Sequence, residues 1–301
     1  MNIRYIRQAD IDKERWDACI DNSLNGLIYA KAWYLNHICS NWDAVIIGDY
    51  EAVLPLPWRQ KLGIRYVYPP VFVQQLGLFY TKTINEDAIN KCLQIAQQHF
   101  KFIELYINKP VDSDKSRSCT NYILNLKNDY DSLKLKLSNR FLQSLKRASR
   151  YSMHYRADDE AYNNILDIYQ QQYADKSGTT PDDLTRLKAI FADLQIKKQL
   201  HVRNAVNDKS ELLASVILME DNNRLYNIIN IIEPNGRTLE ANYFLYNEIL
   251  KEFSNRNFIL DFEGSDLPGV AKFYQKFNAV YEPFYFYKVN RLPFYIKWLK
   301  N

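Results

Sequence analysis

Apolar side chains recur along the chain with two periods, and these periods predict a mixture of strands and helices. Residues 44–47 and 52–57 alternate with a period of two around a Gly-Asp-Tyr turn, which predicts a hairpin. Residues 86–100 carry apolar side chains at helical spacing instead. The other elements predicted in the first half are strands or extended segments at 3–6, 66–72, 102–107 and 121–126, and helices at 12–20 and 31–38.

The second half shows a similar order of elements after a helical stretch at 130–152. A hairpin at 212–219 and 224–232 turns at Asp221-Asn222-Asn223, where Asn tolerates the positive φ of a tight turn. A buried strand at 258–260 then runs into a turn and an aromatic-rich helix at 270–277. The other predicted elements are strands at 153–156, 200–206 and 280–289, and helices at 161–173, 181–194, 239–253 and 293–299.

Each half thus reads as a short strand, two helices, a hairpin, a helix and further strands. The similarity is one of architecture, because no clean sequence repeat accompanies it. We therefore predict an α/β (α+β) protein of two domains, residues 1–145 and 146–301. No Gly/Ser-rich linker marks the boundary, so the two halves are expected to pack tightly.

Composition excludes several classes of protein. The chain has 301 residues, of which 47% are hydrophobic, so it is long enough for two domains and too apolar for disorder. A net charge of +4 is too mild to imply nucleic acid on its own. The four cysteines form no CxxC pair and the four histidines are isolated, so neither a disulfide framework nor a metal site is predicted. Without a signal core or an apolar run of about 20 residues, we predict a cytoplasmic protein with no membrane span.

The segment richest in candidate chemistry is the strand, turn and helix around Asp261. The strand stops at Asp261, Glu263, Gly264 and Ser265, and Pro268 stands near the start of the next helix. Polar side chains at the end of a strand are typical of ligand sites in open α/β sheets. In a partly dry cleft, Asp261 or Glu263 would be a candidate general base. The plainer interpretation is that these residues only cap the following helix.

A basic segment precedes the second domain. Lys146, Arg147 and Arg150 are spaced so that several of them share a helix face, and no acid lies among them. Together with Ser265 they are candidate substrate-binding residues, suited to the phosphates of a nucleotide-linked acceptor or of tRNA. We favour the alternative of a solvated face, or of cations that neutralise acids elsewhere, because a chain with 39 basic residues contains local runs.

Three ordered stretches of the second half carry a resemblance to a known family. They are Leu137-Ser138-Asn139-Arg140 with Lys146-Arg147-Ala148, Leu213-Ala214-Ser215-Val216 with Leu225-Tyr226-Asn227, and Leu260-Asp261-Phe262-Glu263-Gly264-Ser265 with Phe273-Tyr274-Gln275-Lys276-Phe277. With looser matches in the first half, they resemble the GNAT acyltransferase superfamily, most of all its tandem branch of Fem-type and BioF2-like proteins. The resemblance implies two GNAT-like domains, each with a mixed, mostly antiparallel sheet flanked by helices. The first domain would be degenerate, because it has no counterpart of Asp261-Phe262-Glu263-Gly264-Ser265.

Tyr274 stands where the tandem branch usually has Lys, in its Phe-Lys-x-x-Phe element. The residues here, Phe273-Tyr274-Gln275-Lys276-Phe277, are instead similar to the Phe-Tyr-x-Lys element of ordinary GNAT acetyltransferases. In those enzymes the Tyr lies beside the thioester sulfur and protonates the departing thiolate, so the resemblance implies a catalytic role for Tyr274. The alternative, favoured by the helical spacing of Phe273, Tyr274 and Phe277, is a core aromatic.

The resemblance also implies a phosphate-binding turn before the helix at 239–253. Ordinary GNAT enzymes hold the CoA pyrophosphate with the backbone amides of a Gly-rich turn at a helix N-terminus. The matching residues are Asn235, Gly236, Arg237 and Thr238, which form only a fragment of that turn. Glu240 follows closely, and its charge is expected to repel phosphate.

Taken as a whole, the resemblance implies an N-acyltransferase of the acetyltransferase type. It would transfer an acyl group from acetyl-CoA or another acyl-CoA to a small-molecule amine or a nucleotide-linked acceptor bound between the two domains, without a metal. One alternative is an aminoacyl-tRNA-dependent Fem-type transferase that acts on a cell-wall precursor; tRNA is less favoured, because the long helical insertion of some Fem proteins is not found. The other alternative is a catalytically inactive GNAT-like binding protein.

Overall fold

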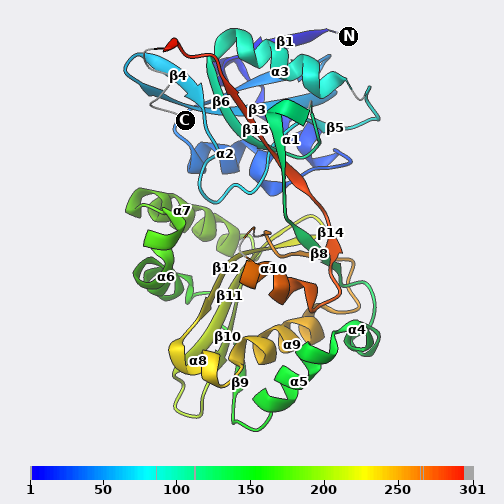
Figure 1. The fold of residues 1–301 in the computed structure, drawn as a ribbon, viewed down its shortest axis with the longest axis vertical. Helices are drawn as coiled ribbons and strands as arrows, with labels where there is room; N and C mark the ends of the chain where they lie inside the picture. The colour runs from blue at the N-terminus through cyan, green and yellow to red at the C-terminus, as the bar shows by residue number, and fades with distance from the viewer. Residues whose placement is uncertain (1, 86, 112, 265, 267, 295–301) are drawn as a thin grey trace. The chain divides into compact units, whose positions relative to one another are not determined.

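A computed structural model describes residues 2–85, 87–111, 113–264, 266 and 268–294. The chain divides into unit 1, residues 1–119 with 283–301, and unit 2, residues 120–282 (Figure 1). These limits differ from the predicted boundary near residue 145. The reason is that residues 120–145 pack with unit 2, whereas the last strand, β15 (Phe284–Asn290), pairs with β6 (Phe102–Ile107) of unit 1.

Unit 1 is built on an eight-stranded sheet with the order β1-β2-β3-β4-β6-β15-β7, to which β5 is added by pairing with β3. The remaining strands are β1 (Ile3–Ile6), β2 (Trp42–Ile47), β3 (Ala52–Lys61), β4 (Ile64–Val67), β5 (Phe79–Tyr80) and β7 (Ser116–Cys119). The helices are η1 (Gln8–Asp10), α1 (Lys13–Asp21), η2 (Ile28–Ala30), α2 (Ala32–Ile38), α3 (Ala88–His99) and η3 (Ser113–Lys115). The predicted hairpin at 44–57 and the predicted helix at 86–100 are therefore confirmed as β2–β3 and α3.

Unit 2 is built on a seven-stranded sheet with the order β14-β8-β13-β12-β11-β10-β9. Its strands are β8 (Tyr122–Asn125), β9 (His154–Ala157), β10 (Leu200–Val206), β11 (Leu212–Asp221), β12 (Arg224–Ile232), β13 (Ile259–Asp261) and β14 (Val280–Tyr281). Its helices are α4 (Tyr130–Lys136), α5 (Asn139–Ala148), α6 (Tyr162–Ser177), α7 (Pro181–Ile196), α8 (Pro234–Thr238), α9 (Ala241–Phe253) and α10 (Pro268–Gln275). The single strand predicted at 280–289 is divided into β14 and β15, and the helix predicted at 293–299 lies mostly outside the described residues.

The two sheets share one strand order. Strands β1-β2-β3-β4-β6 of unit 1 correspond to β9-β10-β11-β12-β13 of unit 2, and in both cases only the last pair is parallel. Beside that pair, each sheet takes a strand from a distant part of the chain, β15 in unit 1 and β8 in unit 2. The predicted α/β class, with two mixed and mostly antiparallel sheets flanked by helices, is confirmed.

Helices cover both faces of the sheet in unit 2 (Figure 1). Helix α9 packs against α5 and against β10 and β11, and aromatic side chains such as Phe141 and Tyr246 fill this side of the core. Helices α6 and α7 pack against β12, β10 and β11. The helix starts follow from the local sequence, because Ser138 caps α5 and Thr180 forms a capping box with Asp183 at α7. In the described part of the chain, no helix combines the length and the apolar composition needed to cross a bilayer.

Strands β12 and β13 pair over only a short length, which frees the second half of β12. The parallel pairing ends with Tyr226 opposite Asp261, whereas β12 continues to Ile232. At the same level, β12 carries a bulge against β11, because Ile217 faces Ile229 while Leu218 faces Asn227 and leaves Ile228 as the extra residue. Bulges redirect side chains and are frequent next to active sites.

Gly236 in α8 is required by a close contact with β11. A Cβ atom at this position would lie 1.9 Å from the carbonyl oxygen of Leu213. We expect Gly236→Ala to force the backbone apart and to lower the free energy of unfolding by about 2–3 kcal/mol, measured by urea denaturation. Gly269→Ala is the control, because a Cβ there meets no heavy atom within 4 Å and Ala is the better helix former. Equal effects of the two substitutions would contradict this account.

Candidate functional site

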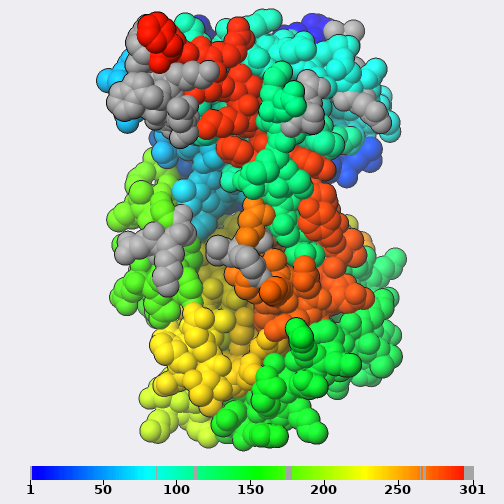
Figure 2. Space-filling model, in the orientation of Figure 1, coloured from blue at the N-terminus to red at the C-terminus, as the bar shows by residue number. Residues whose placement is uncertain are grey.

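A hollow of about 540 Å³ opens on unit 2 between α8, the start of α9 and α10. Its aromatic wall consists of Tyr243, Phe273 and Tyr274. The other lining residues are Asn230, Ile232, Gly236, Arg237, Glu240, Asn242, Gly269 and Val270. In Figure 2, the yellow residues of α8 and the orange residues of α10 belong to this part of the surface. Aromatic walls with a few polar groups are typical of small-molecule sites.

Tyr274 lies on α10 and is 6% exposed, with its side chain in the wall of the hollow. Its ring stacks on Phe262 with 4.5 Å between the centroids, which fixes its orientation. Burial raises the pKa of the Tyr274 hydroxyl well above its usual range, and the negative charges of Glu263 and Asp261 raise it further. The hydroxyl is therefore protonated at neutral pH. Tyr274 has the packing expected of a core aromatic and also lines the hollow; its role as a proton donor stays a prediction.

Asn227, at the bulge of β12, orients the Tyr274 hydroxyl. Its amide nitrogen donates to Tyr274 at 3.4 Å and to the hydroxyl of Tyr246 at 2.7 Å. Because both hydroxyls accept these hydrogen bonds, each keeps its own hydrogen for another acceptor. Tyr246 is fully buried and is not part of the lining, whereas Tyr274 borders the hollow. Of the two hydroxyls, that of Tyr274 is the one placed to donate to a bound molecule.

The carboxylate of Asp261, predicted as a general base, is held by its neighbours at the end of β13. Its Oδ2 accepts from Arg224 at 2.6 Å, and its Oδ1 accepts from the side chain of Asn121 and the amide of Glu263, both at 3.0 Å. Burial raises the pKa of Asp261, although Arg224 and the two hydrogen bonds oppose this rise. Asp261 is not among the residues that line the hollow. Its contacts favour a role in holding the turn that follows.

That turn places Glu263 near Tyr274. Glu263 and Gly264 are both left-handed, with φ of 60° and 53°. A Cβ at Gly264 would lie 2.1 Å from the carbonyl oxygen of Thr120, so the turn requires glycine for two reasons. The charge of Glu263 is close enough to raise the pKa of Tyr274. Ser265, the substrate-binding residue predicted in this turn, lies outside the described residues.

The residues predicted to form a phosphate-binding turn form helix α8 instead. Gly236 and Arg237 line the hollow, and Asn235 and Thr238 do not. Arg237 donates to the hydroxyl of Tyr173 at 2.9 Å. Gly236 is explained by its close approach to β11, which is a packing requirement that does not involve phosphate.

The N-terminus of α9, where the phosphate was expected, carries the carboxylate of Glu240. Glu240 is the left-handed residue that precedes α9, with φ of 58°, and it accepts from Nε of Arg147 at 3.0 Å. The backbone dipoles that hold a phosphate at a helix start stabilise a carboxylate in the same way. Arg147 therefore neutralises an acid of its own unit, as the favoured interpretation predicted. Lys146 and Arg150 are exposed.

Several polar residues of the hollow were not predicted from the sequence. Asn230 and Asn242 exchange two hydrogen bonds, of 3.0 and 3.2 Å, between β12 and α9. Lys276 donates to the hydroxyl of Tyr243 in the aromatic wall. The available signal was the interruption of the apolar run of β12 by Asn227 and Asn230, which are costly to bury in a strand without partners.

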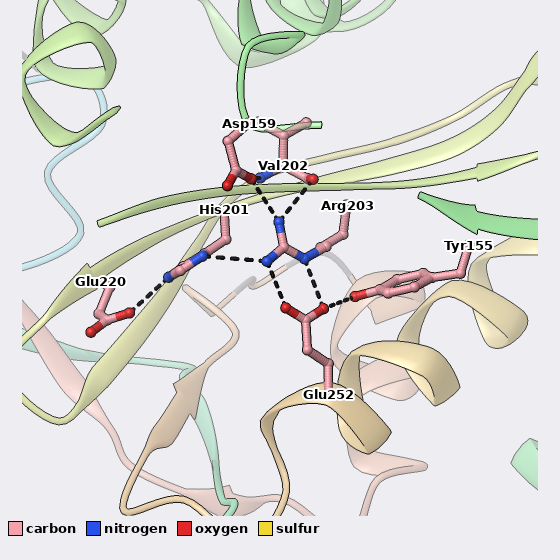
Figure 3. A network of polar contacts seen from close by, with 7 residues as sticks. All are labelled: Tyr155, Asp159, His201, Val202, Arg203, Glu220 and Glu252. Atoms are coloured by element: carbon pink, nitrogen blue, oxygen red, sulfur yellow. Dashed lines mark hydrogen bonds and ion pairs between the residues drawn. The ribbon is translucent and has the colours of Figure 1, made fainter. Parts of the chain in front are cut away.

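A second cluster with displaced pKa values lies on β10, and none of its members lines the hollow. Arg203 donates twice to Glu252, at 2.8 and 2.6 Å, and once to Asp159 at 2.6 Å (Figure 3). Burial alone would raise the pKa of Glu252, but the hydrogen bonds from Arg203 and Tyr155 lower it. Because the charges are paired within the cluster, it serves to join β9, β10 and α9. In the described residues, no group of three or more His, Cys, Asp or Glu side chains is placed to hold a metal ion.

Comparison with known proteins agrees with this geometry. Residues 136–273 match the sequence model of the acetyltransferase (GNAT) domain. The comparison with curated proteins found no match. Among solved structures, FemX superposes with a TM-score of 0.65 at 12% identity, over 97% of this chain and 98% of its own.

Two further solved structures share the fold over nearly their whole length. L-PGS from Bacillus licheniformis has a TM-score of 0.53 at 11% identity, with 96% of this chain and 95% of that chain covered. A tandem GNAT protein from the clavulanic acid biosynthesis pathway has a TM-score of 0.52 at 11% identity, with 97% and 99% covered. Residues 136–273 thus resemble a GNAT acetyltransferase domain, and the fold of nearly the whole chain, with its two GNAT-like domains, is shared with FemX and with a tandem GNAT protein.

Proposed function

We propose that unit 2 is an N-acyltransferase that transfers an acyl group from an activated donor to an amine beside Tyr274. One observation carries this proposal: a protonated tyrosine hydroxyl borders a hollow at the point where β13 no longer pairs with β12. Acyl transfer needs a neutral amine, a donor for the developing oxyanion and often a proton for the leaving group. In the hollow, the hydroxyl of Tyr274 can supply the proton for the leaving group.

The proposed step uses two residues. The amine nitrogen attacks the carbonyl carbon of the donor, the bond from that carbon to the leaving sulfur or oxygen breaks, and Tyr274 gives its proton to the leaving atom. The proton that the attacking nitrogen loses as the amide forms returns to the Tyr274 oxygen and restores the hydroxyl. The ammonium form of the amine first loses a proton, and we assign this to Glu263, whose charge raises the pKa of Tyr274. Because Glu263 does not line the hollow, the proton would reach it through an intervening water. Asp261 is assigned a positioning role, because it binds Arg224 and the amide of Glu263.

Acyl-CoA is the first candidate donor, as expected for an acetyltransferase of this superfamily. A thioester arm fits a hollow of about 540 Å³ with an aromatic wall. The diphosphate of CoA is less well supported, because Glu240 brings a carboxylate to the N-terminus of α9. The carboxylate of Glu240 favours a second candidate function, that of a Fem-type transferase. In this function the donor is an aminoacyl ester of tRNA and the acceptor is a cell-wall precursor.

The donor can be tested with acetyl-CoA and S-acetylpantetheine, which has the thioester arm but no diphosphate. We expect both to raise the thermal midpoint, since a ligand at 100 times its Kd stabilises by about 2.7 kcal/mol. Removing one negative charge with Glu240→Gln is expected to tighten acetyl-CoA binding about tenfold, a gain of roughly 1.4 kcal/mol, and to leave S-acetylpantetheine unchanged. Glu160→Gln, at an exposed position outside the hollow, serves as the control.

Each outcome distinguishes the candidates. If neither thioester stabilises the protein and charged tRNA binds at low salt, the aminoacyl ester replaces the thioester as donor. If tRNA fails to bind at low salt, the second candidate is withdrawn. If no thioester and no aminoacyl ester yields an acylated amine, the proposal of acyl transfer is overturned in favour of an inactive GNAT-like binding protein.

A further inference from the structure

A second hollow, of about 690 Å³, lies in unit 1 along the edge strand β1. Its lining comes from β1, the start of α1, β4 and the end of α3, and it includes the guanidinium groups of Arg4, Arg7, Arg15 and Arg65. It shares no residue with the hollow beside Tyr274. An inference about this hollow therefore stands apart from the proposed acyl transfer.

In the part of the hollow near α1, Arg15 already has partners within the chain. Arg15 forms an ion pair with Asp49. Asp12 caps α1 by accepting from the amide of Arg15 at 3.1 Å, and its own amide donates to the hydroxyl of Tyr50 at 2.8 Å. Arg15 also lies over the Tyr50 ring, 4.9 Å from its centroid. These groups satisfy one another, so this part offers little to a charged ligand.

The part near α3 is built around a stacked pair of rings. Tyr5 and His99 stack with 3.6 Å between their centroids and 9° between their planes. Tyr5 donates to the carboxylate of Asp43, which is 3% exposed. Arg65 lies 3.6 Å from the same carboxylate and over the ring of Phe100, 5.4 Å from its centroid. Arg65 is therefore held in a fixed position beside the His99 imidazole.

Two guanidinium groups beside the Tyr5–His99 pair are available to an anion. Arg4 and Arg7 are exposed, and neither forms an ion pair with another described residue. Burial lowers the pKa of His99, and the charges of Arg65 and Arg7 lower it further, against the opposing effect of Asp43. Both arginines line the same hollow as His99. In and around the hollow there are as many carboxylates (Asp10, Asp12, Asp43 and Asp49) as arginines, but Arg4 and Arg7 stay outside the ion pairs of the described residues.

The two units can be compared at this place through their strand registers. Tyr5 on β1 faces the residue two positions after Asp43 on β2. Tyr155 on β9 faces the residue two positions after Arg203 on β10. Tyr5 therefore corresponds to Tyr155, and Asp43 corresponds to Arg203.

The helix residue that lies next to these two strand positions differs between the units. Glu252 precedes a buried Phe at the end of α9, and His99 precedes a buried Phe at the end of α3, so the two correspond. In unit 2, the carboxylate of Glu252 binds Arg203 with two hydrogen bonds (Figure 3). In unit 1, His99 brings no carboxylate to Arg65 and Arg7. An anion from outside the chain can take that place.

We propose that the hollow along β1 is a binding site for a phosphate ester, whose oxygens accept hydrogen bonds from Arg7, Arg65 and His99. Guanidinium groups bind phosphate with two parallel hydrogen bonds, and the oxygens of a phosphate ester would give Arg7 the anionic partner that it lacks among the described residues. The same phosphate chemistry occurs in a free nucleotide and in the backbone of RNA. The stacked Tyr5–His99 pair supplies an aromatic surface beside it.

The test observes His99 directly by NMR. The protein has only four histidines, so the His99 imidazole signal can be assigned with His99→Gln and followed during additions of inorganic phosphate, AMP and a short single-stranded RNA. We expect a saturable shift of the His99 signal and a rise of its pKa, because a bound anion favours the imidazolium. The signals of His37, His154 and His201 should stay in place. Tighter binding of AMP than of RNA identifies a nucleotide site, and the reverse, with steep salt dependence, identifies RNA.

The control separates local contacts from net charge. Arg4→Gln combined with Arg7→Gln is expected to weaken phosphate binding at least tenfold, measured by the same His99 shift. Lys61→Gln combined with Lys82→Gln removes the same charge from exposed positions outside the hollow, and binding should be nearly unchanged. The proposal is overturned if the His99 signal fails to respond to any of the three ligands, or if the two double variants weaken binding equally.

Discussion

Tyr274→Phe is expected to lower kcat by about 10²–10⁴-fold, the usual contribution of a general acid, once a donor has been identified by the binding tests. The reason is that Tyr274 lines the hollow and, in the proposed mechanism, its hydroxyl gives its proton to the leaving atom. The ring, its stacking on Phe262 and the fold should remain, because only one hydroxyl is lost. Steady-state kinetics with and without a good leaving group measure the effect, and a low-pKa leaving group should recover part of the rate.

Tyr246→Phe is the matched control for that experiment. The hydroxyl of Tyr246 accepts from the same amide of Asn227, at 2.7 Å, but Tyr246 does not line the hollow. We expect its removal to cost about 1 kcal/mol of stability, as for an ordinary buried hydrogen bond, and to change kcat far less than Tyr274→Phe does. Similar losses of kcat in the two variants would show that the hydrogen bonds of Asn227, and not a proton from Tyr274, control the rate.

Arg203→Met is expected to lower the free energy of unfolding by about 3–5 kcal/mol at neutral pH, the typical result of breaking a buried ion pair from one side. Arg203 is 5% exposed and makes three short hydrogen bonds to Glu252 and Asp159 (Figure 3). The substitution leaves the carboxylate of Glu252 half-buried with only Tyr155 as a donor. Urea denaturation at several pH values measures the loss.

The loss of stability in Arg203→Met should depend on pH in a defined direction. In the native protein the pKa of Glu252 is lowered, so the pair contributes stability above the ordinary pKa of Glu, and this contribution is lost as pH falls through the lowered value. In Arg203→Met the buried carboxylate is destabilising while it is ionised. The difference between the two proteins should therefore be largest near neutral pH and should shrink in acid, where Glu252 is protonated in both.

Two further variants confine the effect to the buried cluster. Lys188→Met breaks an exposed ion pair with Asp167 in the same unit, and it should cost less than about 1 kcal/mol. Adding Glu252→Met to Arg203→Met should restore much of the lost stability, because no buried carboxylate is then left without a partner. Asp159 is more exposed and keeps the hydrogen bond from the amide of Val202. If Lys188→Met proves as damaging as Arg203→Met, or the difference grows in acid, the assignment of this cluster as a structural joint is wrong.

Short sequence motifs predicted some residues of the candidate site, but they did not predict the contacts that those residues make. Tyr274 was identified from a short motif, and the structure places it in the hollow. Asp261 was identified in the same way, but a sequence pattern does not reveal that Arg224 and Asn121, which are distant in sequence, hold its carboxylate. Gly236 matched a phosphate-binding turn in sequence, whereas its actual constraint is the carbonyl oxygen of Leu213 on a neighbouring strand.

The sequence by itself determined the order and type of most of the longer elements, because hydrophobic periodicity, caps and turn residues act over a few neighbouring residues. It missed the short strands β5 and β7 and helix α8, and it joined α4 with α5 and β14 with β15. It also determined the repeated architecture, since each half carries the same succession of elements. The tertiary structure alone decided where the units divide, because β8 and β15 pair with strands far away in the chain. It also decided which polar residues meet, from Glu240 and Arg147 at the start of α9 to Tyr5 and His99 beside β1. Such meetings depend on strand register and on the packing of helices on the sheet, and the chemistry of both hollows follows from them.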